Sequence, residues 1–324
     1  MLGDGLRIVP FDDTRHDAVV TFENRFLPAS QQWKTERSKR FDREHPAPEK
    51  LRVLLVDADD AIVGTAFARS AEIVGKANGA FTLFARVDPH WQRRGIGTRL
   101  FNDMERHALA HGAPRLLTIT YGNEPAGLEF LAKRGYREYM RRTRWALQLA
   151  SFEPLRYTTP GEIAEEADVE ILDLASALSN GRVPDVTRQL YDVHREILEE
   201  LPLPLRPNWP DLERYTAQLE DPEIHREASA VAVRGGRVLG LTIVALLDNG
   251  IASSIVTGAV REGRGKRLGL ALKLHALRVL KAGGREIVAT INDADNAPTL
   301  RILKTLGYEP EPAIIRFEKR VSSD

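Results

Sequence analysis

Two arginines and two glycines lie together where a strand is expected to lead into a helix. The segment QRRGIGT, residues 92–98, places Arg93 and Arg94 beside Gly95 and Gly97, and an apolar repeat typical of a helix follows. The first N–H groups of a helix have no partner within it and carry the positive end of its dipole. Glycines let a phosphate approach these groups, and arginines add charge. The segment therefore predicts a site for a phosphorylated ligand. The alternative is a glycine-rich helix start with solvated arginines, and this turn alone favours neither.

A similar turn lies 172 residues further along the chain. Residues 92–136 align with residues 264–308 without a gap, and 11 of the 45 positions are identical. Three of the identities are glycines at expected turns, where a glycine marks a need of the backbone. The recurrence favours the phosphate site and predicts a tandem duplication. The pattern breaks at SFEPLRYTTPG, so the expected domains are residues 1–150 and 151–324.

Each half shows the same order of strands and helices, which predicts a mixed α/β or α+β sheet. A helical region is expected ahead of each hairpin, over residues 14–40 and 185–219. The first half then predicts a hairpin over 51–68, a strand over 79–88, a helix over 98–111, a strand over 115–121, a helix over 124–136 and a strand over 142–149. The second half predicts a hairpin over 229–247, a strand over 253–260, a helix over 268–282, a strand over 286–292, a helix over 297–308 and a strand over 314–320.

The composition limits the classes of function. The 324 residues include 46 Lys and Arg and 46 Asp and Glu, so the zero net charge argues against a general nucleic-acid or membrane-surface binder. The absence of cysteine excludes disulfides and thiolate metal sites, and no apolar run has the length of a signal peptide or membrane span. We expect a cytoplasmic protein. His107 and His111 have a metal-compatible spacing without a third ligand, so no metal is expected.

The pattern [QR]-x-x-G-x-[GA] resembles the acetyl-CoA-binding loop of the GCN5-related N-acetyltransferase (GNAT) superfamily. VDPHWQRRGIGTRLF resembles motif A of that family, and NEPAGLEFLAKRGY resembles its motif B. The second half, with TGAVREGRGKRLGLALK and NAPTLRILKTLGY, is similar in layout to mycothiol-synthase-like two-domain acetyltransferases. There Arg267 occupies the position of the first glycine. Neither the nucleoside-triphosphate loop nor the dinucleotide fingerprint is present.

This resemblance implies two tandem GNAT domains, each a mixed, mostly antiparallel central sheet flanked by helices. In that fold two parallel strands splay apart, and the pantetheine of acetyl-CoA lies in the gap. The strand ends at Val87 and Val260 would pair with pantetheine, and Asn123, Asn292 or Asn296 would bind its arm. The pyrophosphate would be held by Gln92, Arg93, Arg94, Gly95, Ile96, Gly97 and Thr98 in the first half, and by Arg264, Gly265, Lys266, Arg267, Leu268 and Gly269 in the second.

The implied reaction is transfer of an acetyl group from acetyl-CoA to the amine of a small molecule or peptide. Such a transfer needs positioning and a general base, and an acid can protonate the leaving thiolate. Many GNAT enzymes have an acidic tyrosine four residues before the motif B glycine, where this chain has Leu131 and Leu303. The sequence does not identify the base, for which the candidates are Glu23, Asp88, Glu124 and Glu262.

Three hypotheses remain open at this stage. Both halves could serve an acetyltransferase, or the chain could be a non-catalytic or half-degenerate acetyl-CoA-binding sensor or scaffold. In the third, one half catalyses while the other supports it, and analogy with tandem relatives makes the second half the expected catalytic one. The chain would be a monomer, in which the halves form a pseudo-dimer, or a homodimer.

Overall fold

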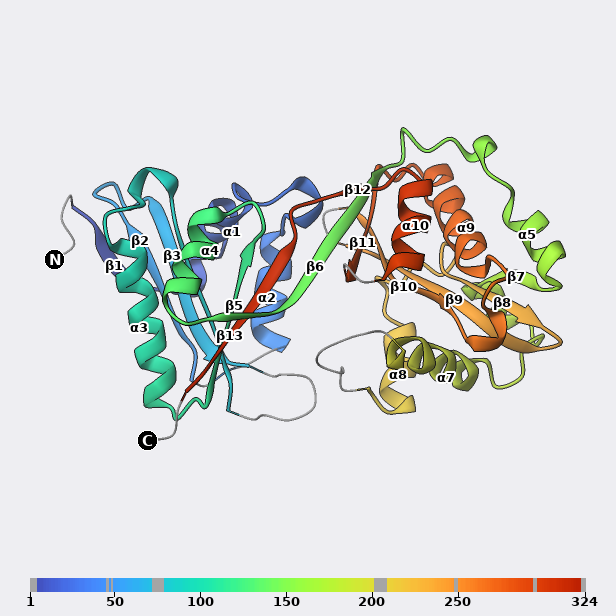
Figure 1. The fold of residues 1–324 in the computed structure, drawn as a ribbon, viewed down its shortest axis with the longest axis horizontal. Helices are drawn as coiled ribbons and strands as arrows, with labels where there is room; N and C mark the ends of the chain where they lie inside the picture. The colour runs from blue at the N-terminus through green and yellow to red at the C-terminus, as the bar shows by residue number, and fades with distance from the viewer. Residues whose placement is uncertain are drawn as a thin grey trace. The chain divides into compact units, whose positions relative to one another are not determined.

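The chain folds into two compact units (Figure 1). The computed structural model describes residues 5–44, 47, 49–71, 79–200, 209–247, 250–293 and 296–321. The first unit comprises Met1–Arg141 and Pro312–Asp324, and the second comprises Arg142–Glu311. The mixed α/β architecture predicted from the sequence is confirmed in both.

The first unit is built on a sheet with helices on both faces. Its strands follow the order β1 (Arg7–Pro10), β2 (Leu51–Val56), β3 (Ile62–Ser70), β4 (Phe81–Val87), β5 (Arg115–Tyr121) and β13 (Ile314–Arg320). Adjacent residues of a strand point to opposite faces. Accordingly, Leu55 joins the core under α3 (Ile96–Ala110), whereas Leu54 joins a core with Val19 of α1. The remaining helices are α1 (His16–Asn24), α2 (Thr35–Glu44), α4 (Pro125–Lys133) and the 3-10 turns Asp13–Arg15, Ala29–Gln31 and Pro89–Trp91.

The second unit repeats this layout. Its strands follow the order β6 (Arg137–Gln148), β11 (Ile287–Asp293), β10 (Ala252–Ala259), β9 (Arg237–Leu246), β8 (Ala230–Arg234) and β7 (Glu170–Asp173), and β12 (Glu309–Pro310) pairs with β6. The apolar face of α9 (Leu268–Ala282) packs on β8, β9 and β10, and α7 (Val186–Glu199) also contacts β9 and β10. The other helices are α5 (Pro160–Ala167), α6 (Leu174–Ser179), α8 (Leu212–Leu219), α10 (Ala297–Thr305) and the 3-10 turns Pro154–Arg156 and Arg261–Gly263.

Two parallel strands lie at the centre of each unit and pair over a very short length. In the first unit β4 pairs with β5 only at Phe81↔Leu116 and Thr82↔Leu117. In the second, β10 pairs with β11 only at Ala252↔Val288 and Ser253↔Ala289. Beyond these pairs the ladder ends, although the strands continue toward their carboxyl ends, so each sheet leaves the space that the GNAT resemblance implies.

The last strand of each half completes the sheet of the other unit. β13 pairs with β5 from Ile314↔Tyr121 to Arg320↔Arg115, and it buries Ile315 and Phe317 in the first core. Residues 142–148 of β6 pair with β11 and bury Trp145 and Leu147 in the second. The packing therefore divides the chain after Arg141 and returns residues 312–324 to the first unit, whereas the repeat alone placed one boundary at residue 150.

Candidate active site

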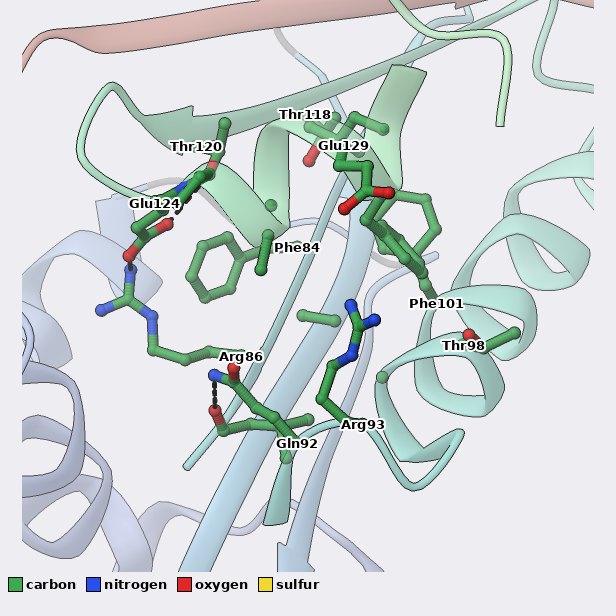
Figure 2. A pocket seen from close by; sticks show the side chains of 18 of the residues that line it. Phe84, Arg86, Gln92, Arg93, Thr98, Phe101, Thr118, Thr120, Glu124 and Glu129 are labelled. Atoms are coloured by element: carbon green, nitrogen blue, oxygen red, sulfur yellow. Dashed lines mark hydrogen bonds and ion pairs between the residues drawn. The ribbon is translucent and has the colours of Figure 1, made fainter. Parts of the chain in front are cut away.

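A cavity of about 710 Å³ opens beside the first glycine-arginine turn (Figure 2). Gln92, Arg93, Gly95, Gly97 and Thr98 line it from the turn and the start of α3. It continues between the separated strands, where its wall includes residues 84–87 of β4 and 118–120 of β5. Its size is that of a ligand site, and it links a helix N-terminus to the gap between two parallel strands.

Backbone conformation shapes the turn. Arg93 and Gly95 both adopt positive φ, at 63° and 77°, a conformation that glycine adopts at no steric cost and that other residues adopt less often. The side chain of Gln92 donates a hydrogen bond from Nε2 to the carbonyl oxygen of Val87 at 2.9 Å, which ties the turn to the end of β4. Ile96 is buried in the core and fixes the first residue of α3. The free N–H groups of α3 are thus held at the cavity.

The two arginines of this turn have different roles. Arg93 lines the cavity and forms no ion pair with any described residue. Arg94 is not among the lining residues; it lies over the ring of Trp91 at 4.9 Å and donates to the carbonyl of His90 at 3.4 Å. Asn123 lies in an exposed turn outside the lining. Of the predicted charged and amide groups of the first half, Arg93 and Gln92 therefore face the site.

The other end of the cavity carries a buried arginine between two carboxylates. Arg86 of β4 lies 3.5 Å (Nε) from Glu23 of α1 and 3.6 Å (Nη2) from Glu124, the residue that precedes α4. Thr120 of β5 donates to Glu124 at 2.8 Å, and Thr65 of β3 donates to Glu23. Figure 2 shows Arg86 and Glu124 together at one end and Arg93 at the other.

The four predicted base candidates occupy different environments. Glu124 lines the cavity, and Glu262 belongs to the second unit, where it pairs with Arg237 at 2.9 Å. Burial raises the pKa of Glu23, although Arg86 and Thr65 oppose the shift. Burial would also raise the pKa of Asp88, but hydrogen bonds from His90 and Arg25 outweigh it and hold that pKa below its ordinary value. Glu124 alone of the four candidates reaches the cavity.

The second turn has the same backbone, but its two arginines form ion pairs with carboxylates of the same unit. Arg267 occupies the position of Gly95 with φ of 59°, and its guanidinium lies 3.4 Å from Glu166 and 3.3 Å from Thr158. Arg264 forms an ion pair with Glu200. Val260 and Leu268, predicted to border the cofactor, are buried. A cavity of about 460 Å³ at this turn is lined by Glu166, Ala167, Asp168, Arg234, Gly265, Lys266 and Arg267, without residues of β10 or β11.

Two positions beside the gap carry different residues in the two units. Lys273 stands where the repeat has Phe101, and its Nζ donates to Ser254 Oγ at 3.2 Å inside the unit. Gly258 occupies the position that corresponds to Arg86. The backbone oxygen of Arg86 lies against Gly64 of the neighbouring strand, and that of Gly258 lies against Gly240 in the same way.

Helices α7 and α10 close the rest of that space. A Cβ on Gly258 would lie 2.8 Å from Ile197 of α7, and one on Gly269 would lie 3.6 Å from Ile302 of α10. Asn292 donates to Thr290 at 3.4 Å, and Asn296 caps α10 by accepting from the N–H of Thr299 at 3.3 Å. Both amides predicted to bind the pantetheine arm are thus engaged within the unit.

Sequence reasoning missed Arg86 and the aromatic residues beside it, Phe26 and Phe84. One signal was available, because FTLFARV is a mostly apolar strand in which Arg86 lies two residues after Phe84 and so on the same face. The histidines behave as expected of a helix end: His107 contacts the carbonyl of Glu49 at 2.6 Å, and His111 donates to that of His107 at 2.9 Å. Within the described part of the chain, no helix is both long and apolar enough to cross a bilayer.

A sheet opened between two parallel strands, beside a glycine-rich start of a helix, is the arrangement of the GNAT class of acetyltransferases. The family model for the acetyltransferase (GNAT) family matches residues 16–136, and this part of the chain belongs to that family.

Known proteins resemble the chain over most of its length. It is 26% identical over 283 residues to the mycothiol acetyltransferase of Thermobifida fusca, covering 80% of each chain. It is 25% identical over 260 residues to that of Pseudarthrobacter chlorophenolicus, covering 78% of this chain and 74% of the relative.

Solved structures share the fold. A GCN5-related N-acetyltransferase from Sphaerobacter thermophilus matches with a TM-score of 0.74 and 18% identity, covering 100% of this chain and 99% of that one. A tandem GNAT protein from the clavulanic acid biosynthesis pathway matches with a TM-score of 0.69 and 21% identity, covering 98% and 100%. Together the family and its relatives support acetyl transfer to an amine, and they do not favour a purely sensing protein.

Proposed function

We propose that the first unit transfers the acetyl group of acetyl-CoA to a small-molecule amine and that the second unit is a scaffold. The observation that carries this proposal is the continuous cavity from the first turn, through the β4–β5 gap, to Glu124. In the second unit the matching positions hold paired arginines, Lys273 and Gly258. This assignment departs from the expectation, based on analogy, that the second half catalyses.

The residues of the turn account for donor binding. The N–H groups at the start of α3, with the charge of Arg93, suit the pyrophosphate. Gly97 leaves room for close approach, because the nearest atom to a Cβ built there is Val87 Cγ2 at 3.9 Å. Val87 and Thr118 line opposite sides of the gap in which the pantetheine arm would lie. These contacts would bring the thioester toward the end of the cavity that holds Glu124.

Glu124 is positioned to serve as the general base. The amine nitrogen attacks the thioester carbonyl carbon, its proton passes to Glu124, and the C–S bond breaks to release the thiolate of CoA. Thr120 donates a hydrogen bond to this carboxylate and Arg86 pairs with it, so both side chains orient it. Leu131, at the position of the usual acidic tyrosine, is buried in the core, so the thiolate would take its proton from solvent.

Substituting Glu124→Gln tests this role. The change keeps the size of the side chain but removes the base, so kcat/KM for acetyl-CoA-dependent CoA release should fall about 10²- to 10⁴-fold. Acetyl-CoA affinity, measured by calorimetry, should stay within about threefold, because Glu124 lies away from the pyrophosphate end.

The matched control is Glu262→Gln, which removes the candidate carboxylate of the second unit. We expect it to leave turnover unchanged. Equal losses in both variants, or full activity in Glu124→Gln, would refute the assignment of the base.

A further inference from the structure

Arg86 carries a buried guanidinium that forms no hydrogen bond with any residue the structure describes. Its side chain is 8% exposed, and its contacts with Glu23 and Glu124 are ion pairs at 3.5 and 3.6 Å rather than hydrogen bonds. Its Nη1 is buried and lacks any partner among the described residues. Buried donors without partners are rare in native proteins, because water no longer compensates them. Since Arg86 also lines the cavity, a ligand is the natural partner for these donors.

The surroundings of Arg86 are aromatic. Its Cζ lies 4.8 Å from the ring centroid of Phe26, 5.3 Å from that of Phe84 and 5.7 Å from that of Tyr121. Phe84 in turn stacks on Phe67 at 5.6 Å. Phe26 and Phe84 also line the cavity, so an apolar group of a ligand would meet two rings beside the guanidinium. Charge–charge attraction is stronger in such a water-poor site than in bulk solvent.

The charge balance of the site favours an anion on the acceptor. Burial raises the pKa of Glu23, which weakens it as a permanent counter-ion for Arg86. Glu124 is the other counter-ion, and it becomes neutral when it takes the proton of the attacking amine. Arg86 would then be a buried cation with little compensation, which is costly. A carboxylate on the acceptor would supply the missing charge and accept two of the free N–H groups.

We propose that the acceptor is an α-amino acid with an apolar side chain. Its amine lies at Glu124, its carboxylate accepts hydrogen bonds from Arg86, and its side chain packs on Phe26 and Phe84. An α-amino acid suits this end of the cavity because its amine and carboxylate are separated by one carbon, and Arg86 and Glu124 are direct neighbours. The inference rests on the proposed function and names the substrate class of the same site.

The test compares amino acids with the amines that lack their carboxylate. L-phenylalanine is measured against phenethylamine, and L-leucine against 3-methylbutylamine, with acetyl-CoA-dependent thiol release as the readout. The amino acids should have kcat/KM values about 10- to 100-fold higher, the range expected for hydrogen bonds to a charged group. Equal or faster turnover of the decarboxylated amines would overturn the inference.

The variant Arg86→Gln then tests whether Arg86 causes the preference for amino acids. Because Arg86 also orients Glu124, the variant should lower kcat for both classes, but it should raise KM for the amino acids about 10- to 100-fold more than KM for the decarboxylated amines. Arg69→Gln is the matched control, because Arg69 lies on the neighbouring strand β3 and contacts the ring of Phe41 at 4.7 Å. Unchanged calorimetric binding of acetyl-CoA verifies that each variant is folded.

The outcomes separate this inference from the function on which it rests. An equal change of KM for amino acids and plain amines in Arg86→Gln would show that Arg86 does not recognise a carboxylate. Turnover of plain amines with no preference for amino acids would leave acetyl transfer intact and remove this inference alone. Failure of the first unit to bind acetyl-CoA would instead remove the proposed function.

Discussion

The two glycine-arginine turns have the same backbone and different chemistry. In the first, Arg93 and Gly95 have positive φ; in the second, the matching residues Gly265 and Arg267 do, so glycine and arginine have exchanged places. Each turn starts a 15-residue helix beside two parallel strands that separate. The duplicated backbone is therefore compatible with either residue, and the glycine count alone does not decide whether a turn binds a ligand.

What lies next to each turn separates the two. Arg93 faces a cavity that continues between two parallel strands, whereas Arg264 and Arg267 pair with Glu200 and Glu166 of their own unit. The pair Arg86 and Glu124 of the first unit corresponds to Gly258 and Asn296 in the second. The comparison teaches that a duplicated fold can keep the frame of a site in both copies while internal side chains replace the ligand in one.

The sharpest way to break this comparison is to place a negative charge at each turn. Gly97→Glu should raise the Kd for acetyl-CoA at least ~100-fold, because a carboxylate would face the pyrophosphate and such like-charge contacts cost several kcal/mol. The backbone has room, since the nearest atom to a Cβ there is 3.9 Å away. Gly269→Glu, with 3.6 Å to Ile302, should leave binding and turnover unchanged. Comparable losses in both would mean that both turns bind.

The exchanged strands offer a second contrast, of intermediate size. Ile315 of β13 is fully buried in the first core, so Ile315→Ala should destabilise that unit by about 2–5 kcal/mol. Because acetyl-CoA stabilises the unit that binds it, thermal unfolding with and without the ligand identifies the affected transition. Leu147→Ala in β6 removes similar volume from the second core and should lower the other transition. If Leu147→Ala lowers the ligand-stabilised transition as much, the comparison of the units fails.

The smallest expected effect concerns Lys273, which is buried in the second unit. Burial lowers the pKa of Lys273 from 10.5 to about 8, so between these values the unfolded chain binds more protons than the folded one. Stability should therefore rise with pH across this window, and the full penalty applies below about pH 8. Lys273→Met should stabilise the protein by roughly 1–3 kcal/mol at pH 7 and by less as the pH approaches 10. Denaturant unfolding at several pH values measures this, and a gain that grows with pH would contradict it.

The frame of the fold could be predicted because it depends on local signals. The glycine-arginine turns, the hairpins and the helices that follow each turn carry their own periodicity, and the structure confirms them. The partner of a strand is not local. RTRWALQL and IIRFEKR both alternate as strands should, and nothing in either distinguishes a place beside β5 from one beside β11.

The contents of the site were less predictable for the same reason. Arg86, Glu23 and Glu124 come from a strand, a helix and a turn, and only the packed sheet brings them together. The sequence gives only a weak indication of the buried lysine in the second unit. Lys273 interrupts the leucines of LGLALKLHAL, and the structure buries this helix on several sides. Whether such a lysine extends to solvent or turns inward depends on its neighbours, which the sequence does not specify.

Calorimetric titration of the whole chain with acetyl-CoA tests the central claim most directly. The account predicts one binding site per chain, retained in Gly269→Glu and lost in Gly97→Glu. Two sites per chain would contradict it, because the second turn would then hold acetyl-CoA despite its paired arginines and the side chains that fill its gap.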